Sequence, residues 1–126
     1  EVTSGFNGFN IYSVDNTRIL YAQDNKVVTA LNLTVTGTFT NNSDITLKEN
    51  IIDLNKTINA DWKQFNMKDN PDQVRYGVIA QELEQNHPEF VSENEGIKSV
   101  NYIDLLVAKV AELENRIKEL ESKQNI

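Results

Sequence analysis

The residues of this chain best suited to chemistry are a serine and a lysine, Ser43 and Lys48, which stand five positions apart. A serine hydroxyl attacks a carbonyl carbon when a base takes its proton, and a lysine amine in its neutral form can be that base. Lys48 lies between Leu47 and two isoleucines, so we expect it to be partly buried, which favours the neutral form. The alternative interpretation makes Ser43 a turn or cap residue and Lys48 an exposed helix lysine beside Glu49.

Other candidate groups have weaker patterns. His87 is the only histidine and the chain has no cysteine, so we expect no zinc site; because it precedes Pro88, we expect it in a solvent-facing turn. Three glutamates could supply the two carboxylates of an acid–base pair, but their pattern favours a charged helix surface. They are Glu82, Glu84 and Glu89. The sequence has no GxxxxGK phosphate loop, so we predict neither a metal nor a cofactor.

The composition is that of a small soluble protein with one or two domains. The 126 residues include 39% hydrophobic and 25% charged side chains, an ordinary balance for a folded chain. The net charge of -7 argues against nucleic acid as a partner, because phosphate binding needs clustered lysine and arginine. No apolar run approaches the roughly 20 residues of a membrane span. The chain begins with Glu1 rather than Met, and we interpret it as the later part of a longer protein.

The residues before Ser43 have the pattern of strands and turns. Residues 11–14 and 19–21 are short β-prone runs separated by Asp15-Asn16, and residues 31–40 alternate between apolar and polar side chains. Large apolar residues are few, so we expect this segment to need partner chains. The period changes at residue 43, and we therefore predict two domains, 1–42 and 43–126. A site of self-cleavage would be well placed at this border.

The second domain has an α+β pattern. Residues 47–58 have the apolar spacing of a short helix, with Thr46 and Glu49 as its capping box. The elements that follow this helix, up to residue 96, are separated by turn residues. In the first strand, Trp62 and Phe65 are expected to join a core. The predicted elements are strand 61–67, turn 70–72, strand 74–80, helix 81–84 ended by His87-Pro88, and turn 93–96.

The chain ends with the seven-residue repeat of a coiled coil, over about residues 101–124. In a parallel coil Lys109 would meet Glu114 of the next chain and Arg116 would meet Glu121, so both pairs have opposite charges. We therefore favour self-association over a single helix packed on its own domain. Apolar residues fill both core positions of the repeat: Ile103, Leu106, Val110, Leu113, Ile117 and Leu120.

Two patterns in this repeat indicate different numbers of chains. β-Branched residues at one core position with leucine at the other favour dimers. Residues 116–121, with the sequence RIKELE, resemble a short signature of parallel trimers, in which the Arg116 stem packs over the core and its guanidinium meets Glu121. The residues by themselves leave both numbers open.

Three ordered blocks of the sequence resemble the C-terminal intramolecular chaperone domain of phage endosialidases, tail fibres and tail spikes. They cover about two thirds of the chain and are more specific together than any one of them. The departures are Ile45 and Thr46, where arginine is frequent, and Val78 in place of phenylalanine; these do not touch the serine–lysine pair. The blocks are 43–51 (SDITLKENI), 76–84 (YGVIAQELE) with 88–91 (PEFV), and 98–106 (KSVNYIDLL).

This resemblance implies a fold and a mechanism. Three copies of the domain form a parallel trimeric coiled coil, which holds three fibre chains in register while the β-structured stem folds. Each domain then acts as a self-cleaving serine endopeptidase, in a single turnover in cis, at the bond between Asn42 and Ser43. Ser43 is the implied nucleophile and Lys48 the implied base, with Glu49 and Asn50 as candidate orienting groups.

The resemblance also implies partners and a location. Residues 1–42 would be the distal end of a phage fibre, tail spike or neck appendage, and the partners would be two further copies of the chain and their upstream fibre segments, without nucleic acid or membrane. The protein would be made in the host cytoplasm, the fibre part would remain in the virion tail, and the chaperone part would be released. Some of the neck appendage proteins that this chain resembles bind ATP. This chain, however, has no phosphate loop.

Two alternatives to enzymatic self-cleavage remain open. The first is a non-catalytic structural trimeric fibre tip involved in host adsorption, in which Ser43 is a turn residue. The second is slow breakage of the chain through the Asn42 side chain, which should not depend on Lys48.

Overall fold

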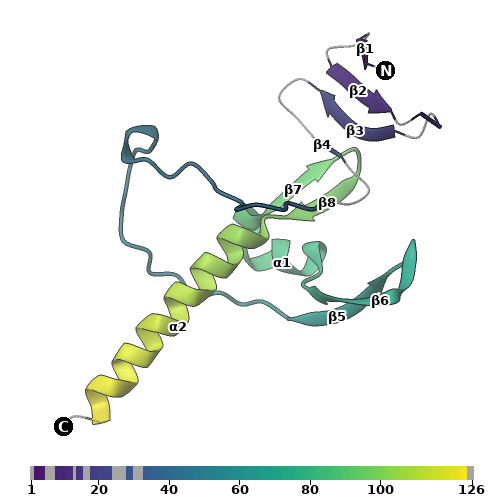
Figure 1. Cartoon of the computed structure of the whole chain (residues 1–126). Helices are drawn as coiled ribbons and strands as arrows, with labels where there is room; N and C mark the ends of the chain where they lie inside the picture. Colours follow the sequence, from purple (N-terminus) through teal and green to yellow (C-terminus); the bar gives the residue numbers. More distant parts are fainter. Residues whose placement is uncertain are drawn as a thin grey trace. The chain divides into compact units, whose positions relative to one another are not determined.

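The computed structural model describes residues 2–4, 8–12, 14–15, 18–23, 28–29 and 33–124, which belong to two compact units, Glu1–Glu49 and Asn50–Ile126 (Figure 1). The protein is small and mixed α/β, with antiparallel sheets and a long C-terminal helix, as predicted. The border between the units follows Glu49. The border predicted from the sequence, between Asn42 and Ser43, concerns cleavage and stays a prediction.

The first unit contains a four-stranded antiparallel sheet in the order β1-β2-β3-β4. Ile11 in the second strand pairs with Leu20 in the third, so the two β-prone runs on either side of the predicted turn form a hairpin. Ser13 and Asn16, which belong to this prediction, lie outside the described residues. The strands are β1 (Val2–Ser4), β2 (Gly8–Tyr12), β3 (Arg18–Gln23) and β4 (Val28–Thr29).

The alternating segment 31–40 does not form the predicted strand over its described part, residues 33–40. Residues 31 and 32 lie outside the described residues. Leu33, Val35 and Phe39 are exposed, and Phe39 keeps 62% of its surface open to solvent. Alternation does not make a strand when the apolar side has no neighbouring layer to pack against.

The helix predicted over residues 47–58 is wrong. Its place is taken by η1 (Ile45–Leu47), a single 3-10 turn, and residues 48–62 continue without helix or strand. The predicted capping box is also wrong, because Asp44 caps the turn: its Oδ1 accepts hydrogen bonds from Thr46 N at 2.8 Å and Thr46 Oγ1 at 2.7 Å. The residues that follow are rich in β-branched side chains, which lose rotamer freedom in a helix: Ile51, Ile52, Thr57 and Ile58.

In its described part, the second unit consists of two antiparallel hairpins and two α-helices (Figure 1). The strand and helix predictions between residues 61 and 84, the end of that helix at His87-Pro88, and the long C-terminal helix are confirmed. Helix α2 extends well past the rest of this unit. The elements in chain order are β5 (Lys63–Met67), β6 (Asn70–Gly77), α1 (Ala80–Asn86), the 3-10 turn η2 (Pro88–Phe90), β7 (Val91–Asn94), β8 (Ile97–Val100) and α2 (Tyr102–Gln124).

The β7–β8 hairpin has a tight two-residue turn. Glu95 and Gly96 have φ angles of 51° and 79°. Two consecutive residues in the left-handed region give the turn the twist that the flanking strands need. The turn predicted at residues 93–96 is therefore confirmed.

The β5–β6 hairpin turns earlier than predicted. The chain turns at Lys68-Asp69, and Asn70 already pairs with Met67, so the turn predicted at residues 70–72 is wrong. Pro71 lies within the strand instead. A two-stranded hairpin leaves one edge of each strand without ladder hydrogen bonds, and proline is tolerated at such an edge.

The core of the second unit is small and gathers around α2. Leu105 is fully buried. Trp62, which was predicted to join a core, keeps 46% of its surface exposed, so that prediction is wrong, and Phe65 is half-buried. Both belong to or adjoin the β5–β6 hairpin, which packs little against the rest of the unit. The other buried apolar residues come from separate parts of the chain: Ile58, Val78, Leu83, Phe90 and Ala108.

One tyrosine ties the start of α2 to the end of β6. The Tyr102 hydroxyl accepts a hydrogen bond from Val78 N at 3.1 Å and donates to the Val78 carbonyl oxygen at 3.4 Å. Gly77 leaves the space that this hydroxyl occupies, because a β-carbon at residue 77 would collide with the tyrosine side chain. Glycine at this position thus permits a close approach between strand and helix.

Replacing Gly77 with alanine is expected to destabilise the second unit by about 1–3 kcal/mol, the usual cost of an overpacked contact. Gly37→Ala is the matched control, since a β-carbon at Gly37 would have no atom within 4 Å and should change the free energy of unfolding by less than about 0.5 kcal/mol. Urea unfolding followed by circular dichroism measures both variants. Equal stability of the two would contradict the steric role of Gly77.

Candidate functional site

Ser43 and Lys48 lie in hydrogen-bond contact, with 2.6 Å between Lys48 Nζ and Ser43 Oγ. The η1 turn brings them together, because Leu47 N donates to the Asp44 carbonyl oxygen and Lys48 N donates to that of Ile45, each at 3.1 Å. The five-residue spacing is therefore bridged by one 3-10 turn rather than by a helix. All the residues that make this contact belong to the first unit.

Asp44 organises the turn, and sequence reasoning did not identify it. The hydrogen bonds from the Thr46 hydroxyl and backbone N–H lower the pKa of Asp44, which keeps its carboxylate charged at neutral pH. Aspartate is one of the preferred residues at the start of a helical turn, so its position directly after Ser43 was the signal. A charged Asp44 stabilises the turn that sets the distance between Ser43 and Lys48.

The serine–lysine pair is open to solvent in the single chain. Ser43 and Lys48 are both exposed, so the predicted partial burial of Lys48 is wrong. Glu49 and Asn50, the predicted orienting groups, are exposed as well, and Asn50 has a left-handed φ of 54°; their roles stay predictions. The apolar residues on either side of Lys48 in the sequence also keep 43–86% of their surface exposed: Ile45, Leu47, Ile51, Ile52 and Leu54.

A second set of polar contacts, in the other unit, holds the backbone of Ile58, whose side chain is 2% exposed. Ile58 N donates to Glu112 Oε2 at 2.9 Å, and the Ile58 carbonyl oxygen accepts a hydrogen bond from Lys109 Nζ at 3.1 Å. Lys109 and Glu112, one turn apart on α2, also pair with each other at 3.0 Å. Asn59 N donates to His87 Nε2 at 2.9 Å. We call this arrangement, in which three side chains hold the backbone of two residues, the Ile58 clamp.

His87 is buried, with 6% of its surface exposed, so the predicted solvent-facing position is wrong. Because its Nε2 accepts the Asn59 N–H, the ring proton is on Nδ1, which lies 3.3 Å from Glu89 Oε1. Lys56 pairs with the same glutamate at 2.8 Å, and the Lys56 hydrogen bond is the main cause that lowers the pKa of Glu89. A lone histidine before a proline gives no sequence signal of which backbone group it will meet.

The glutamates of α1 and η2 pair with lysines rather than with one another. Glu84 accepts hydrogen bonds from Lys98 at 2.9 Å, and this contact raises the pKa of Lys98. Glu89 pairs with Lys56, and Glu82 lines a pocket on another side of α1. These contacts fit the interpretation of a charged surface and not that of an acid–base pair.

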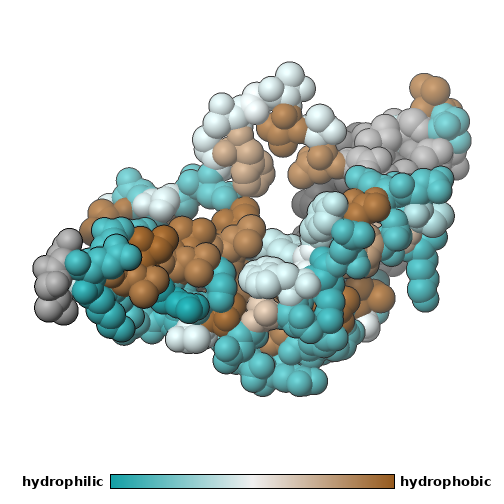
Figure 2. Space-filling model, turned by 90° about the horizontal axis from the view of Figure 1, so that it is seen from below, coloured by the Kyte–Doolittle hydropathy of each residue, from teal (hydrophilic) through white to brown (hydrophobic). Residues whose placement is uncertain are grey.

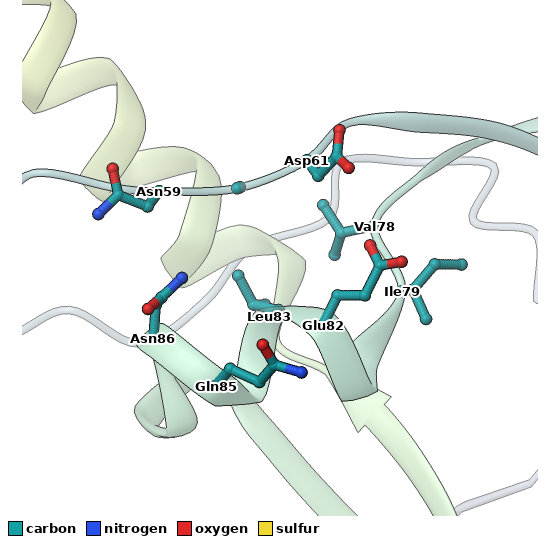
Figure 3. Close-up of a pocket in the computed structure, with 9 residues that line it drawn as sticks. Asn59, Asp61, Val78, Ile79, Glu82, Leu83, Gln85 and Asn86 are labelled. Atoms are coloured by element: carbon teal, nitrogen blue, oxygen red, sulfur yellow. The ribbon is translucent and has the colours of Figure 1, made fainter.

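The pocket, about 470 Å³ in volume, lies between α1 and the chain before β5 (Figure 3). Val78 and Leu83 form its apolar floor, and the carboxylates of Asp61 and Glu82 stand near its rim together with side-chain amides. Asp61 pairs with Lys63 at 2.8 Å, and this hydrogen bond raises the pKa of Lys63. Within the described residues, no three histidine, cysteine, aspartate or glutamate side chains are grouped so as to hold a metal ion.

Helix α2 keeps its heptad stripe exposed, and Figure 2 shows apolar side chains along the helix toward its end. The face that packs on the second unit is a different one, formed by Leu105, Ala108 and Glu112. The helix thus packs on its own domain through one face, while self-association through the other stays a prediction. The six residues of the predicted coil core keep 45–60% of their surface: Ile103, Leu106, Val110, Leu113, Ile117 and Leu120.

The charged positions beside this stripe differ in how they are used. Lys109, predicted to meet Glu114 of a neighbouring chain, binds Ile58 and Glu112 of its own chain, and Glu114 pairs with Lys118 at 3.1 Å. Arg116 and Glu121, the residues of the trimer signature, are exposed. In the part of the chain that the structure describes, no helix has the length and apolar content needed to cross a bilayer.

In the sequence, the serine–lysine pair directly precedes a small α/β unit that ends with a long amphipathic helix. Residues 43–92 match the family model peptidase S74, described as chaperone of endosialidase. This segment thus matches a family of chaperones of the endosialidase type that is named as peptidases, in agreement with the resemblance seen in the sequence. The match begins at Ser43 and ends in β7, so α2 lies beyond it. Neither the curated proteins nor the solved structures gave a match.

The buried carboxylate of Glu112 is expected to make the stability of the fold depend on pH. The Ile58 N–H and the Lys109 ammonium lower the pKa of Glu112. A carboxyl group with a lower pKa in the folded chain stabilises the fold above its unfolded pKa, roughly 4–4.5, and loses this contribution as the pH falls through the folded value. We expect Glu112→Gln to lower the thermal midpoint near pH 7, with a smaller effect below about pH 4. Midpoints measured across this range test the sign, and an equal loss throughout would contradict it.

Proposed function

We propose that this chain is a self-releasing trimerisation chaperone at the end of a phage fibre, tail spike or neck appendage. Three copies would hold their upstream chains in register, and each copy would then cut itself between Asn42 and Ser43. The observation that carries the proposal is the 2.6 Å contact between Lys48 Nζ and Ser43 Oγ. The family match begins at the same serine, the residue that follows the proposed scissile bond.

The proposed reaction is a single turnover within one chain. Neutral Lys48 Nζ takes the hydroxyl proton of Ser43, and Oγ forms a bond to the carbonyl carbon of Asn42. The carbon–nitrogen bond between these two residues breaks, and the nitrogen takes the proton from Lys48 and leaves as the free amino group of Ser43. Water then opens the ester, which gives a carboxyl group on Asn42 and restores the serine hydroxyl.

The exposure of Lys48 gives a reason for cleavage to wait for assembly. A lysine acts as a base only in its neutral form, and removal from water favours that form. The apolar residues on either side of Lys48 in the sequence are exposed in the single chain, so they offer a surface for neighbouring chains to cover. In the proposed trimer the neighbouring chains would exclude water from Ser43 and Lys48 and so favour the neutral form of the lysine.

A trimeric chaperone meets a physical need of β-structure shared by three chains. Such structure joins distant segments, so its nucleation is slow and entropically costly. A coil formed by α2 would raise the local concentration of the strands and fix their register. Release of the chaperone would then leave the fibre kinetically trapped. Synthesis would take place in the host cytoplasm, and the fibre part would remain in the virion tail without nucleic acid or membrane as a partner.

Substitution of either reacting residue is expected to block self-cleavage. Ser43→Ala removes the nucleophile and Lys48→Ala removes the base, and each should slow the appearance of fragments ending at Asn42 and beginning at residue 43 by at least about 100-fold. Lys48→Arg keeps the positive charge but cannot become neutral, so it should be equally slow. Denaturing gels and intact mass spectrometry of the incubated oligomer measure the conversion.

The matched control for these variants is Lys68→Ala, which removes an exposed lysine from the β5–β6 turn and should cut at the wild-type rate. Cleavage of Lys48→Arg at that rate would show that Lys48 is not the base. Slow cleavage at the same rate in the wild type and in Lys48→Ala would indicate breakage through the Asn42 side chain.

The second candidate function is a non-catalytic trimeric fibre tip involved in host adsorption. The observation that favours it is the solvent exposure of Ser43 and Lys48, since an exposed pair can also be a simple turn contact. Intact chain after long incubation of the assembled oligomer would support this function. It would retain the role of α2 in assembly and remove the role of Lys48 in chemistry.

Assembly through the exposed stripe of α2 is tested by placing a charge in it. Leu113 is 45% exposed in the single chain, and in a trimer three copies would meet in the core, where unpaired aspartates are strongly unfavourable. Leu113→Asp should raise the concentration for half-assembly by at least 100-fold, which is about 5.5 kcal/mol per trimer because the dissociation constant of a trimer scales with the square of that concentration. Asn115→Asp, at an exposed position outside the stripe, should leave it unchanged. Analytical ultracentrifugation measures both, and trimeric Leu113→Asp at the wild-type concentration would contradict the coil.

A further inference from the structure

Glu112 of the Ile58 clamp and the apolar core of the predicted coil lie on different faces of the same helix. Glu112 lies on the face that packs on the second unit and is 8% exposed, whereas Leu113, the next residue, belongs to the exposed stripe. A carboxylate is costly to bury unless hydrogen bonds and an opposite charge compensate for the lost water. Here the backbone N–H of Ile58 and the Lys109 ammonium supply both. The burial of this charge is therefore tied to the capture of the segment that contains Ile58.

The captured segment has no strand to hold it. Residues 48–62 are without helix or strand, so the N–H and carbonyl groups of Ile58 would be left without partners when the side chain is buried. Glu112 accepts from the N–H and Lys109 donates to the carbonyl oxygen, at 2.9 Å and 3.1 Å. Two charged side chains of α2 thus take the place of a neighbouring strand.

The clamp holds the chain ten residues after Lys48, close to the ion pair of Lys56 with Glu89. Between Lys48 and Ile58 the chain runs through residues 49–57, of which none is buried. Ile58 is the first buried residue to follow Lys48 in the sequence, and its backbone is held by the helix that carries the coil stripe. Contacts with α2 therefore hold the C-terminal end of the segment between Lys48 and Ile58.

We propose that Lys109 and Glu112 are positioning residues for self-cleavage, which hold the segment after Ser43 and Lys48 to the helix on which the trimer assembles. This inference rests on the proposed function. When three α2 helices associate, the clamp confines each reactive segment to the neighbourhood of the assembled coil, which raises its effective concentration against the surfaces that cover it. Loss of the clamp should therefore slow cleavage while the coil itself still forms.

The test is the cleavage rate of the double variant Lys109→Met/Glu112→Leu in the whole chain, at a temperature where the trimer is folded. The variant replaces a partly buried ion pair with apolar side chains, an exchange that at buried pairs is often neutral or stabilising, but it leaves the Ile58 backbone without its partners. We expect the same trimer mass and at least fivefold slower cutting between residues 42 and 43. Glu112→Gln, which keeps an acceptor for the Ile58 N–H, should cut faster than the double variant.

The matched control is Glu119→Leu, at the same heptad position one repeat later, where the glutamate is exposed. It should cut within twofold of the wild type. A folded trimer of the double variant that cuts at the wild-type rate would overturn the proposal. If the clamp only stabilises the fold, its loss would lower the melting temperature and leave the cleavage rate of the folded trimer unchanged. Measuring the melting temperature and the cleavage rate therefore separates the two roles.

A further measurement does not depend on whether the clamp variants fold, because it uses neither of them. In the trimer of Ser43→Ala, which stays uncut, the amide hydrogens of Ile58 and Asn59 should exchange at least 100-fold more slowly than those of Ile51 and Ile52. Equal exchange rates would overturn the clamp itself. If the wild type is not cut at all, the proposed function fails, while the exchange rates still report on whether the clamp holds.

Discussion

The capture of the Ile58 backbone by Lys109 and Glu112 is the interaction on which the second unit depends. A chain segment without regular structure can enter a core only if its polar backbone groups find partners there. Because α2 supplies those partners, the Ile58 side chain reaches the centre of the unit, where it meets apolar residues from four other parts of the chain. The ion pair between Lys109 and Glu112 thus lets the Ile58 side chain join the small core around Leu105.

A core of this size has consequences for how the protein can exist. Only six apolar side chains of the described residues are buried, while the stripe on α2 and the residues around Lys48 remain exposed. Small cores give limited stability, and chains with them commonly rely on association. Helix α2 has two distinct faces. One face completes the core of the domain, and the other is exposed and available for association with further copies of the chain.

The sequence allowed prediction where the determinants are local. The long C-terminal helix, the turn at Glu95-Gly96 and the nearness of Ser43 to Lys48 depend on residues a few positions apart. The failures have a common cause in distant partners: residues 47–58 have helical spacing, yet Ile58 is held by α2, and His87 is buried because Asn59 meets it. Trp62 could not be placed either, since its exposure follows from a hairpin that packs little on the rest.

The turn capped by Asp44 has a consequence for timing. Every group that brings Ser43 to Lys48 lies within six residues of sequence, and contacts this local form on the order of a microsecond. The encounter of the two side chains therefore precedes by far any step that requires three chains to meet. In the proposed function, a pair that forms so early can serve a late event only through a slower step that makes the lysine neutral. The time of cleavage would then be set by the covering of Lys48 and not by the meeting of the two residues.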